Sequence, residues 1–212
     1  MILVTGGGGF LGKSLSEKIK SQKIKKNIFF TNKSKKFSII NKDINIDLLS
    51  EAHVKKLFFS KKFKSIIHLS VSRNPIDNPE IRSFDTLNSD LKILMNLLKY
   101  SKNVNKILFL SSAAVYKNVV YKKNKDNNVE LNLVLKKIIS FICNDTKKNK
   151  KLFSAYLLSN NKLTDKNINP FFHRENNLRF NGLTKYISEA ILKEYCREKN
   201  IELQILRPYR II

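Results

Sequence analysis

The sequence predicts an α/β fold built on a doubly wound parallel sheet, and the alternation of two patterns along the chain supports this class. Short apolar runs, such as residues 2–4 and 65–69, alternate along the chain with longer segments of helical periodicity. Strands that alternate with helices in this way form parallel sheets with right-handed crossovers. The length of 212 residues suffices to bury the core of one such domain, expected to cover residues 1–212.

Each element follows from its local pattern. Apolar and β-branched residues predict strands at 2–4, 26–30, within 38–49, and at 65–69, 106–110 and 203–206. Apolar residues repeated every three or four positions predict helices at 13–23, 51–59, 85–101, 129–142 and 182–199. The alternation shows no internal repeat, which excludes a solenoid or propeller.

A glycine-rich segment after the first strand carries the first functional signal. Gly6, Gly9 and Gly12 have the spacing of a turn that lets backbone N–H groups approach a pyrophosphate at a helix N-terminus. Its place between a strand and a helix makes the signal stronger than spacing alone. The segment therefore predicts a dinucleotide-binding site, with a glycine-rich loop that binds no ligand as the alternative.

The formal net charge of +24 raises the hypothesis of a nucleic-acid binder. Of the basic residues, 34 are Lys and 7 are Arg, and the abundance of Lys, Asn and Ile is typical of AT-rich coding sequences. The lysines are spread along the chain without an RNA-binding aromatic motif, which favours a solvated surface. We expect no specific nucleic-acid partner, while nonspecific adhesion to polyanions at low salt stays open.

The two cysteines, Cys143 and Cys196, lie far apart and have no partners at metal-ligand spacing. The pattern predicts a reducing compartment, no disulfide framework and no metal site. Apolar stretches long enough to cross a membrane are absent, so no membrane partner is expected. Because the N-terminus already reads as a strand, a cleaved signal peptide is not expected either. These features together predict a cytoplasmic protein.

Several motifs occur in one order: TGGGGFLG at 5–12, IIHLS at 66–70, SSAAVY at 111–116 and LRP at 206–208. Together they resemble the extended short-chain dehydrogenase/reductases, the NAD-dependent epimerase/dehydratase family that acts mostly on nucleotide-sugars. The resemblance covers nearly the whole chain except residues 117–178. It implies a Rossmann-like NAD(P)-binding fold and hydride transfer at a sugar carbon by an epimerase, dehydratase or ketoreductase.

The resemblance also implies which residues bind the cofactor. Asp47 is expected beside the adenine, and Ser70 beneath a ribose. Where NAD-preferring relatives have an acidic residue at the end of the second strand, this chain has Thr31, Asn32 and Lys33, with Lys35 and Lys36 following. The cofactor is therefore NAD or NADP, with a slight preference for NADP. The expected cofactor-binding residues are Gly6, Gly9, Phe10, Leu11, Gly12, Thr31, Asn32, Asp47, Leu48, Leu69, Ser70 and Lys185.

Catalytic residues are implied in the same way. Ser112 is expected to bind the substrate oxygen, Lys185 to hold the nicotinamide ribose and lower the pKa of a tyrosine, and Asn88 to steady the active-site strands. Simpler interpretations exist: Asp47 as a helix N-terminal carboxylate, Ser112 as a strand-end hydroxyl, and Lys185 as one lysine among many.

The tyrosine that would precede Lys185 by four positions is replaced by Asn181. An amide cannot exchange a proton near neutral pH as a lysine-tuned phenol does. The Tyr-x-x-x-Lys spacings at 195–199 and 121–125 are interpreted as accidental. Tyr116, Tyr186 or a group from the insertion are the alternative bases. Three functions remain open: an enzyme, a catalytically silent or truncated NAD(P)-binding relative that acts as a sensor or partner subunit, and, more remotely, a basic nucleic-acid binder.

The remaining expectations concern the insertion and the end of the chain. Residues 117–178 are rich in Lys and Asn, which favours a surface excursion or partly disordered loop over a lid on the sugar site. The chain ends just after the strand at 203–206, so the smaller C-terminal substrate domain of the family is expected to be largely missing. Relatives commonly dimerise through a four-helix bundle, which implies a homodimer through the helices near 85–101 and 182–199.

Overall fold

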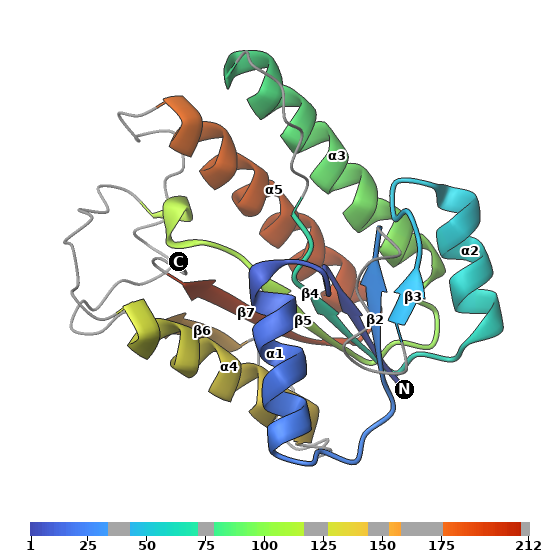
Figure 1. Cartoon of the computed structure of the whole chain (residues 1–212). Coiled ribbons are helices and arrows are strands. Elements are labelled where there is room, and N and C mark those ends of the chain that lie inside the picture. The colour runs from blue at the N-terminus through green and yellow to red at the C-terminus, as the bar shows by residue number, and fades with distance from the viewer. Residues whose placement is uncertain (34–42, 72–78, 117–126, 144–152, 158–175, 209–212) are drawn as a thin grey trace.

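Seven strands form one fully parallel sheet with helices on both of its faces (Figure 1). The computed structural model describes residues 1–33, 43–71, 79–116, 127–143, 153–157 and 176–208. The strands are β1 (Ile2–Thr5), β2 (Ile28–Asn32), β3 (Asp43–Asn45), β4 (Ser65–His68), β5 (Lys106–Leu110), β6 (Phe153–Leu157) and β7 (Glu202–Pro208). The helices are α1 (Phe10–Ser21), α2 (Glu51–Ser60), α3 (Pro79–Tyr100), α4 (Asn127–Cys143) and α5 (Asn176–Glu198), with a short 3₁₀ helix η1 (Ala113–Val115).

The strand order across the sheet is β3-β2-β1-β4-β5-β7-β6. β1 lies inside the sheet, with β2 and then β3 on one side of it. The chain then returns, and β4 pairs with the other side of β1. β1 and β4 pair in register from Ile2 opposite Ser65 to Thr5 opposite His68. This reversal of direction is the switch point of a doubly wound sheet, and ligands bind in the crevice outside the carboxyl ends of the strands there.

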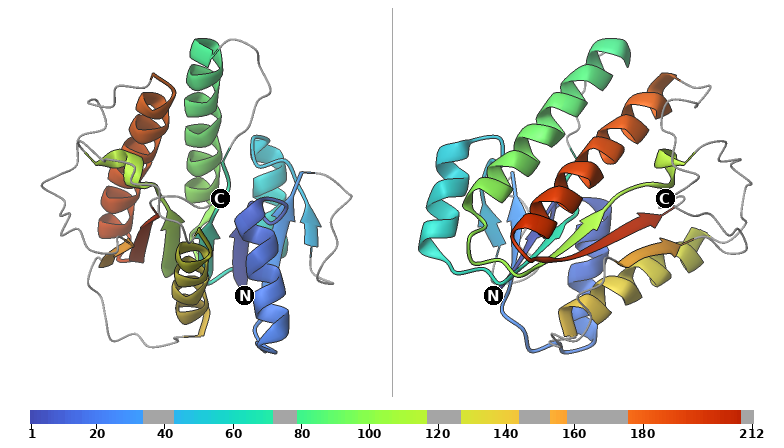
Figure 2. Two further views of the ribbon diagram at one scale, coloured as in Figure 1. Left: turned by 60° about the vertical axis from the view of Figure 1, so that its left-hand side comes forward. Right: turned by 180° about the vertical axis from the view of Figure 1, so that it is seen from behind.

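The helices divide between the two faces of the sheet. α1 and α4 cover one face, and α2, α3 and α5 cover the other (Figure 2). On the first face Leu15 and Ile138 pack against Ile67 and Leu108 of the sheet. A larger core on the second face includes Leu3, Ile66, Ile107, Leu97 and Leu192. Alternate residues of each buried strand thus face different helices, which explains the nearly continuous apolar runs in the sequence.

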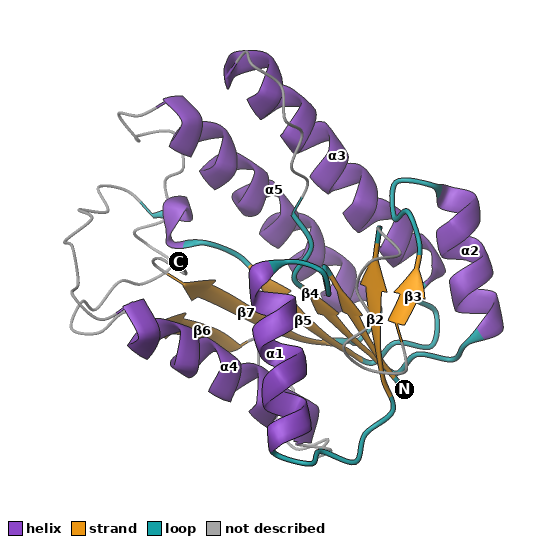
Figure 3. Cartoon of the chain, viewed as in Figure 1, coloured by secondary structure: helices purple, strands orange, loops and turns teal. Residues whose placement is uncertain are grey.

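The predicted fold class is confirmed, and every predicted helix is present. The strand predicted within 38–49 is the short β3, and the part of that stretch before Asp43 lies outside the described residues. Figure 3 shows the same alternation of helices and strands along the sheet. In the part of the chain that the structure describes, no helix is both long and apolar enough to cross a membrane.

One strand was not predicted, and it lies in the insertion. β6 pairs with β7 at the edge of the sheet, from Phe153 opposite Gln204 to Leu157 opposite Pro208. α4, from the same insertion, buries Val134 and Ile138 against the sheet. The expectation of a surface excursion is therefore wrong for residues 127–143 and 153–157, which are integral parts of the fold. The rest of 117–175 lies outside the described residues.

Candidate functional site

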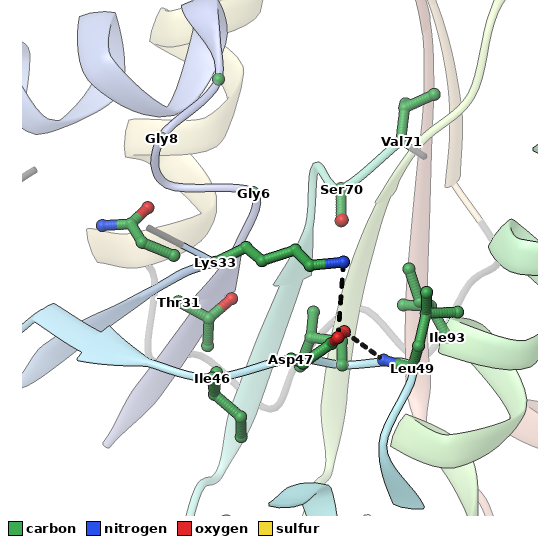
Figure 4. Close-up of a pocket in the computed structure, with 13 residues that line it drawn as sticks. Gly6, Gly8, Thr31, Lys33, Ile46, Asp47, Leu49, Ser70, Val71 and Ile93 are labelled. Carbon is green, nitrogen blue, oxygen red and sulfur yellow. Dashed lines mark hydrogen bonds and ion pairs between the residues drawn. The ribbon is translucent and has the colours of Figure 1, made fainter. Parts of the chain in front are cut away.

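A cavity of about 480 Å³ opens at the switch point between β1 and β4 (Figure 4). The loops that follow β1, β2, β3 and β4 form its walls, as the topology requires. The cavity brings together seven of the predicted cofactor residues: Gly6, Gly9, Thr31, Asn32, Asp47, Leu48 and Ser70. The other lining residues are Gly8, Lys33, Ile46, Leu49, Val71 and Ile93. Of these, only Lys33 had a sequence signal for the cofactor, through its place after the second strand.

The glycine turn packs too closely for side chains. Gly6 adopts a φ of +74°, and a Cβ atom there would lie 2.9 Å from the backbone N and Cα of Ser70. A Cβ at Gly12 would lie 2.4 Å from the carbonyl oxygen of Gly6, so α1 begins in direct contact with the turn. Gly9 is the N-cap of α1 and supplies no capping side chain, an arrangement suited to an anion at the helix N-terminus.

Four predicted cofactor residues beside the turn and β4 do not line the cavity. Leu11 and Leu69 are buried in the core between α1 and the sheet, because an apolar side chain at the start of a covering helix or at a strand end faces the interior. Phe10 is half exposed at the first position of α1. Gly12 acts through its packing against the turn rather than by facing the cavity.

Asp47 and Lys33 face each other across the cavity mouth, as Figure 4 shows. Lys33 Nζ lies 3.4 Å from Asp47 Oδ2, and the backbone N–H of Leu49 donates to Asp47 Oδ1 at 3.0 Å. The second contact fixes the carboxylate in the turn before α2, consistent with the simpler interpretation of this residue. Asp47 nevertheless lines the cavity as well, so both interpretations describe the same side chain.

Thr31 offers a polar group to the cavity. Its side chain is only 3 % exposed, and its hydroxyl has no hydrogen-bond partner among the residues that the structure describes. A buried hydroxyl without a partner costs free energy unless a ligand or water satisfies it. The uncapped helix start, the close-packed glycine turn and this hydroxyl together fit a polar, anionic ligand such as a dinucleotide.

A buried histidine connects the glycine turn with the neighbouring strand. His68 Nδ1 lies 2.7 Å from Thr5 Oγ1, which in turn accepts a hydrogen bond from the backbone N–H of Ser70 at 3.3 Å. The ring stacks on Phe109 at a centroid distance of 5.7 Å. Burial, together with the charge of Lys185, lowers the pKa of His68 to about 3, so the ring is neutral near pH 7.

Lys185 lies at the carboxyl end of β5. Its side chain is 6 % exposed, and its Nζ donates to the carbonyl oxygen of Leu110 at 3.1 Å, 5.0 Å from the ring centroid of Phe109. Burial lowers the pKa of Lys185, while the charges of Asp90 and Glu189 oppose that shift. Lys185 does not line the cavity at the switch point, because it lies beside β5 and its ammonium is directed to Leu110.

Ser112 follows β5 two residues after Leu110. Its hydroxyl accepts a hydrogen bond from the backbone N–H of Ala114 at 3.1 Å and caps η1, while the side chain remains half buried. Lys185 and Ser112 therefore both lie at the carboxyl end of β5. Residue 181 belongs to α5, one helical turn before Lys185, and the side chain of Asn181 lies outside the described residues.

The expectation for Asn88 is wrong. Its side chain is exposed on α3, whereas Asp90 is buried and close enough to act on Lys185 electrostatically. The helical periodicity could have identified Asp90 as a buried residue, since position 90 shares a buried face with Ile93, Leu94 and Leu97.

A buried ion pair between Glu189 and Arg207 lies close enough to Lys185 for its carboxylate to act on the lysine charge. Arg207 Nη2 donates to Glu189 Oε2 at 2.6 Å, Arg207 Nη1 donates to the Tyr116 hydroxyl at 2.9 Å, and Ser111 Oγ donates to Glu189 Oε1 at 2.5 Å. Burial by itself lowers the pKa of Arg207, but the interactions with Glu189 and Tyr116 together raise it. Tyr116 is fully buried in this network, which gives its hydroxyl a structural partner.

Two further tyrosines from the sequence analysis have clear positions. Tyr195 donates to the carbonyl oxygen of Leu98 at 2.9 Å, so its spacing from Lys199 reflects helix packing rather than chemistry. Tyr186 is exposed on α5. The pair at 121–125 lies outside the described residues. Among the residues that are described, no group of three or more His, Cys, Asp or Glu side chains could hold a metal ion.

The strand order, the glycine turn and the cavity at the switch point define a Rossmann-type dinucleotide-binding protein. The model of the NAD dependent epimerase/dehydratase family matches residues 2–132, more than half of the chain. The chain belongs to this family. Among curated protein sequences, none matches it significantly.

Solved structures share the fold at low sequence identity. Pal from Bacillus thuringiensis is 18 % identical with a TM-score of 0.63, over 97 % of this chain and 55 % of that one. A GDP-mannoheptose C4 reductase from Campylobacter jejuni with NADP bound is 16 % identical with a TM-score of 0.62, over 97 % and 46 %. A Thermus thermophilus UDP-glucose 4-epimerase in complex with NAD is 16 % identical with a TM-score of 0.59, over 97 % and 54 %. The chain thus spans about half the length of these structures.

Proposed function

We propose that this protein binds NAD or NADP in the cavity and transfers hydride at a carbon of a nucleotide-sugar, as an epimerase, dehydratase or reductase. The observation that carries the proposal is the close-packed glycine turn at the mouth of a cavity that the buried Thr31 lines, with a hydroxyl that has no partner among the described residues. A bound nicotinamide dinucleotide supplies the hydride acceptor or donor. The family supports this class of chemistry, and the named sugars of the similar structures support the substrate class.

Different residues of the cavity contact different parts of the cofactor. The N-terminus of α1, capped by Gly9, binds the pyrophosphate through backbone N–H groups. Asp47 and Thr31 accept or donate hydrogen bonds at the adenosine end. Ser70, whose backbone is held by Thr5, lies at the edge that continues toward Lys185.

We further infer a preference for NADP from the ammonium group at the cavity mouth. The Lys33 side chain is 75 % exposed, and its Nζ lies 3.4 Å from Asp47 Oδ2, so it can turn to a ribose 2′-phosphate without leaving a buried charge behind. Thr31 and Asn32 add no carboxylate at the end of β2, so a phosphate there meets no repulsion from β2.

Ser112 and Lys185 act on the reacting end. The Ser112 hydroxyl donates to the substrate oxygen at the carbon that exchanges hydride. The Lys185 ammonium, fixed by the carbonyl oxygen of Leu110, hydrogen-bonds the nicotinamide ribose. Asn181 can orient a hydroxyl through its amide but cannot accept its proton.

Asn181 favours a second function. With Asn181 at the position of the family's tyrosine, a catalytically silent NAD(P)-binding protein, serving as a sensor or partner subunit, accounts for the site. A third, more remote candidate is a basic nucleic-acid binder.

Two experiments separate these functions. Fluorescence titration with NADH and NADPH tests the binding site, and failure of both to bind would exclude the first two functions. Hydride exchange with UDP- or dTDP-sugars tests turnover in the wild type and in Asn181→Tyr. Turnover by the wild type supports the enzyme, whereas turnover that only Asn181→Tyr shows supports the silent protein.

Two partners complete the proposal. The nucleotide-sugar needs binding surface beyond the described cavity, supplied by further chain or by another subunit. A second copy of the chain packs against α3 and α5, where Phe84, Met95 and Tyr186 are exposed large hydrophobic residues. Light scattering of the wild type and of Met95→Asp tests the dimer.

The free cysteines, Cys143 and Cys196, suit the reducing conditions of the cytoplasm.

A further inference from the structure

The loops that precede the strands converge at the amino-terminal edge of the sheet, opposite the cofactor cavity. A continuous row of backbone hydrogen bonds joins them, from Ile2 N to Asn27 O (2.8 Å), Lys64 N to Met1 O (2.9 Å), Asn105 N to Lys64 O (3.0 Å) and Glu202 N to Asn105 O (3.0 Å). Segments that lie far apart in the sequence are therefore direct neighbours in space. We call this surface the amino edge, formed by residues 23–27, 61–64 and 102–106 with Met1 between them.

Lysines dominate the amino edge. Its three segments contain eight lysines and no aspartate or glutamate. Lys25, Lys62 and Lys102, one from each segment, are exposed. Glu202, the acidic residue next in the hydrogen-bonded row, lies 3.9 Å from Lys106 and so offsets one of these charges. The parallel topology thus gathers lysines that are dispersed along the sequence into one basic surface.

The shape of the amino edge fits an extended anion. Neighbouring strands lie about 4.8 Å apart, so the row from β2 across β1 and β4 to β5 spans about 14 Å. A single nucleic-acid strand carries one negatively charged phosphate on each nucleotide, so consecutive phosphates can lie along this row. Asn27, Asn103 and Asn105 are exposed between the lysines and add hydrogen-bonding amides.

An exposed aromatic ring flanks the amino edge. Phe59, in the last turn of α2 directly before segment 61–64, is 78 % exposed, with Lys55 Nζ at 5.9 Å from its ring centroid. Rings beside a basic track stack on unpaired bases, which favours single strands over duplexes. Met1 and Phe59 are the exposed large hydrophobic residues described at this edge, too few to insert into a membrane.

We propose that the amino edge binds single-stranded nucleic acid without sequence preference. The lysines contact the phosphates, and Phe59 stacks on a base. The cofactor cavity lies at the opposite ends of the same strands, so both ligands bind at once. The proposal does not depend on the proposed enzymatic function.

The first test compares two variants that lose the same charge. Lys25→Gln/Lys62→Gln/Lys102→Gln changes the amino edge, whereas Lys92→Gln/Lys136→Gln/Lys137→Gln changes exposed lysines of α3 and α4. Anisotropy of a fluorescein-labelled poly(U) strand, measured across a KCl series, reports affinity. The edge variant is expected to lose at least about tenfold in affinity and about two units of salt slope, and the control less than about twofold. Equal losses in both variants would overturn the proposal.

The second test concerns the ring and the class of partner. Phe59→Ala is expected to weaken poly(U) binding by about fivefold or more and to leave binding of a duplex of equal length unchanged. An equal effect on both would overturn single-strand binding. Phosphatidylserine vesicles that bind more tightly than poly(U), and lose binding in the edge variant, would show a membrane surface instead. Thermal unfolding confirms that every variant is folded.

Discussion

The Arg207 guanidinium donates from two of its nitrogens to the two carboxylate oxygens of Glu189, at 2.9 Å to Oε1 and 2.6 Å to Oε2. Both side chains are almost completely buried, and they connect β7 with α5. Ser111, next to Ser112, donates to the same carboxylate. The position of the strand end that carries Ser112 therefore depends on this ion pair.

Removing one partner of the pair should be costly. Glu189→Ala leaves the Arg207 charge buried and uncompensated, and we expect a loss of about 3–5 kcal/mol in the free energy of unfolding. Urea denaturation measures this loss. Glu194→Ala, which removes an exposed ion pair with Arg197 on the same helix, is the control and should change stability little. Similar urea midpoints for the two variants would contradict the structural role of the pair.

The glycine turn should tolerate a methyl group at one position and not at another. At Gly12 a Cβ meets the backbone oxygens of Gly6 and Gly7 within 2.6 Å, so Gly12→Ala should displace α1 from the turn. We expect it to cost about 1–3 kcal/mol and to weaken NAD(P)H binding, as measured by urea unfolding and fluorescence titration. At Gly8 the nearest atom is the side-chain oxygen of Asn32 at 3.1 Å, so Gly8→Ala serves as the milder control.

Stability should depend on pH through His68. Its pKa is about 3 in the folded protein and 6.5 when unperturbed, because burial and Lys185 disfavour the charged ring. The unfolded chain therefore binds the extra proton, and stability present above pH 6.5 is lost as the pH falls toward 3. Compared with His68→Gln, the wild type should lose up to about 2 kcal/mol between about pH 7 and about pH 5. Urea unfolding at both pH values checks this, and parallel losses would contradict it.

Cofactor preference should depend on Lys33. Lys33→Ala removes the ammonium group at the cavity mouth and should weaken NADPH binding by about tenfold, the effect of one charge-assisted hydrogen bond. NADH binding should change by less than about twofold, because NADH carries no 2′-phosphate. Fluorescence titration of both cofactors measures the ratio. Lys92→Ala, on the exposed face of α3, controls for the loss of a positive charge.

The parts of the fold that local pattern determines were predictable. β1, β4 and β5 are buried on both faces, and each therefore appears in the sequence as an uninterrupted apolar run. β6 was missed because its five residues, FSAYL, follow a Lys- and Asn-rich stretch. Its strand conformation depends on pairing with β7, which sequence pattern does not reveal.

The candidate site likewise contains residues that the sequence indicated and residues that only the folded structure reveals. The glycine spacing predicted Gly6, and the family resemblance implied Asp47 and Ser70; all three line the cavity. The roles of His68 and Asp90 were missed, since each depends on a residue brought close only by the sheet topology, Thr5 for one and Lys185 for the other. The choice of Asn88 failed because an exposed and a buried position lie only two residues apart on a helix.

The placement of β6 constrains the order in which the chain can assemble. During synthesis β6 leaves the ribosome before α5 and β7, and β7 is the strand with which it pairs. The nascent chain must keep Phe153–Leu157 unpaired until Glu202–Pro208 has been made and has docked beside β5. The edge of the sheet is therefore completed last, and a chain arrested before β7 would present an unpaired strand to its neighbours.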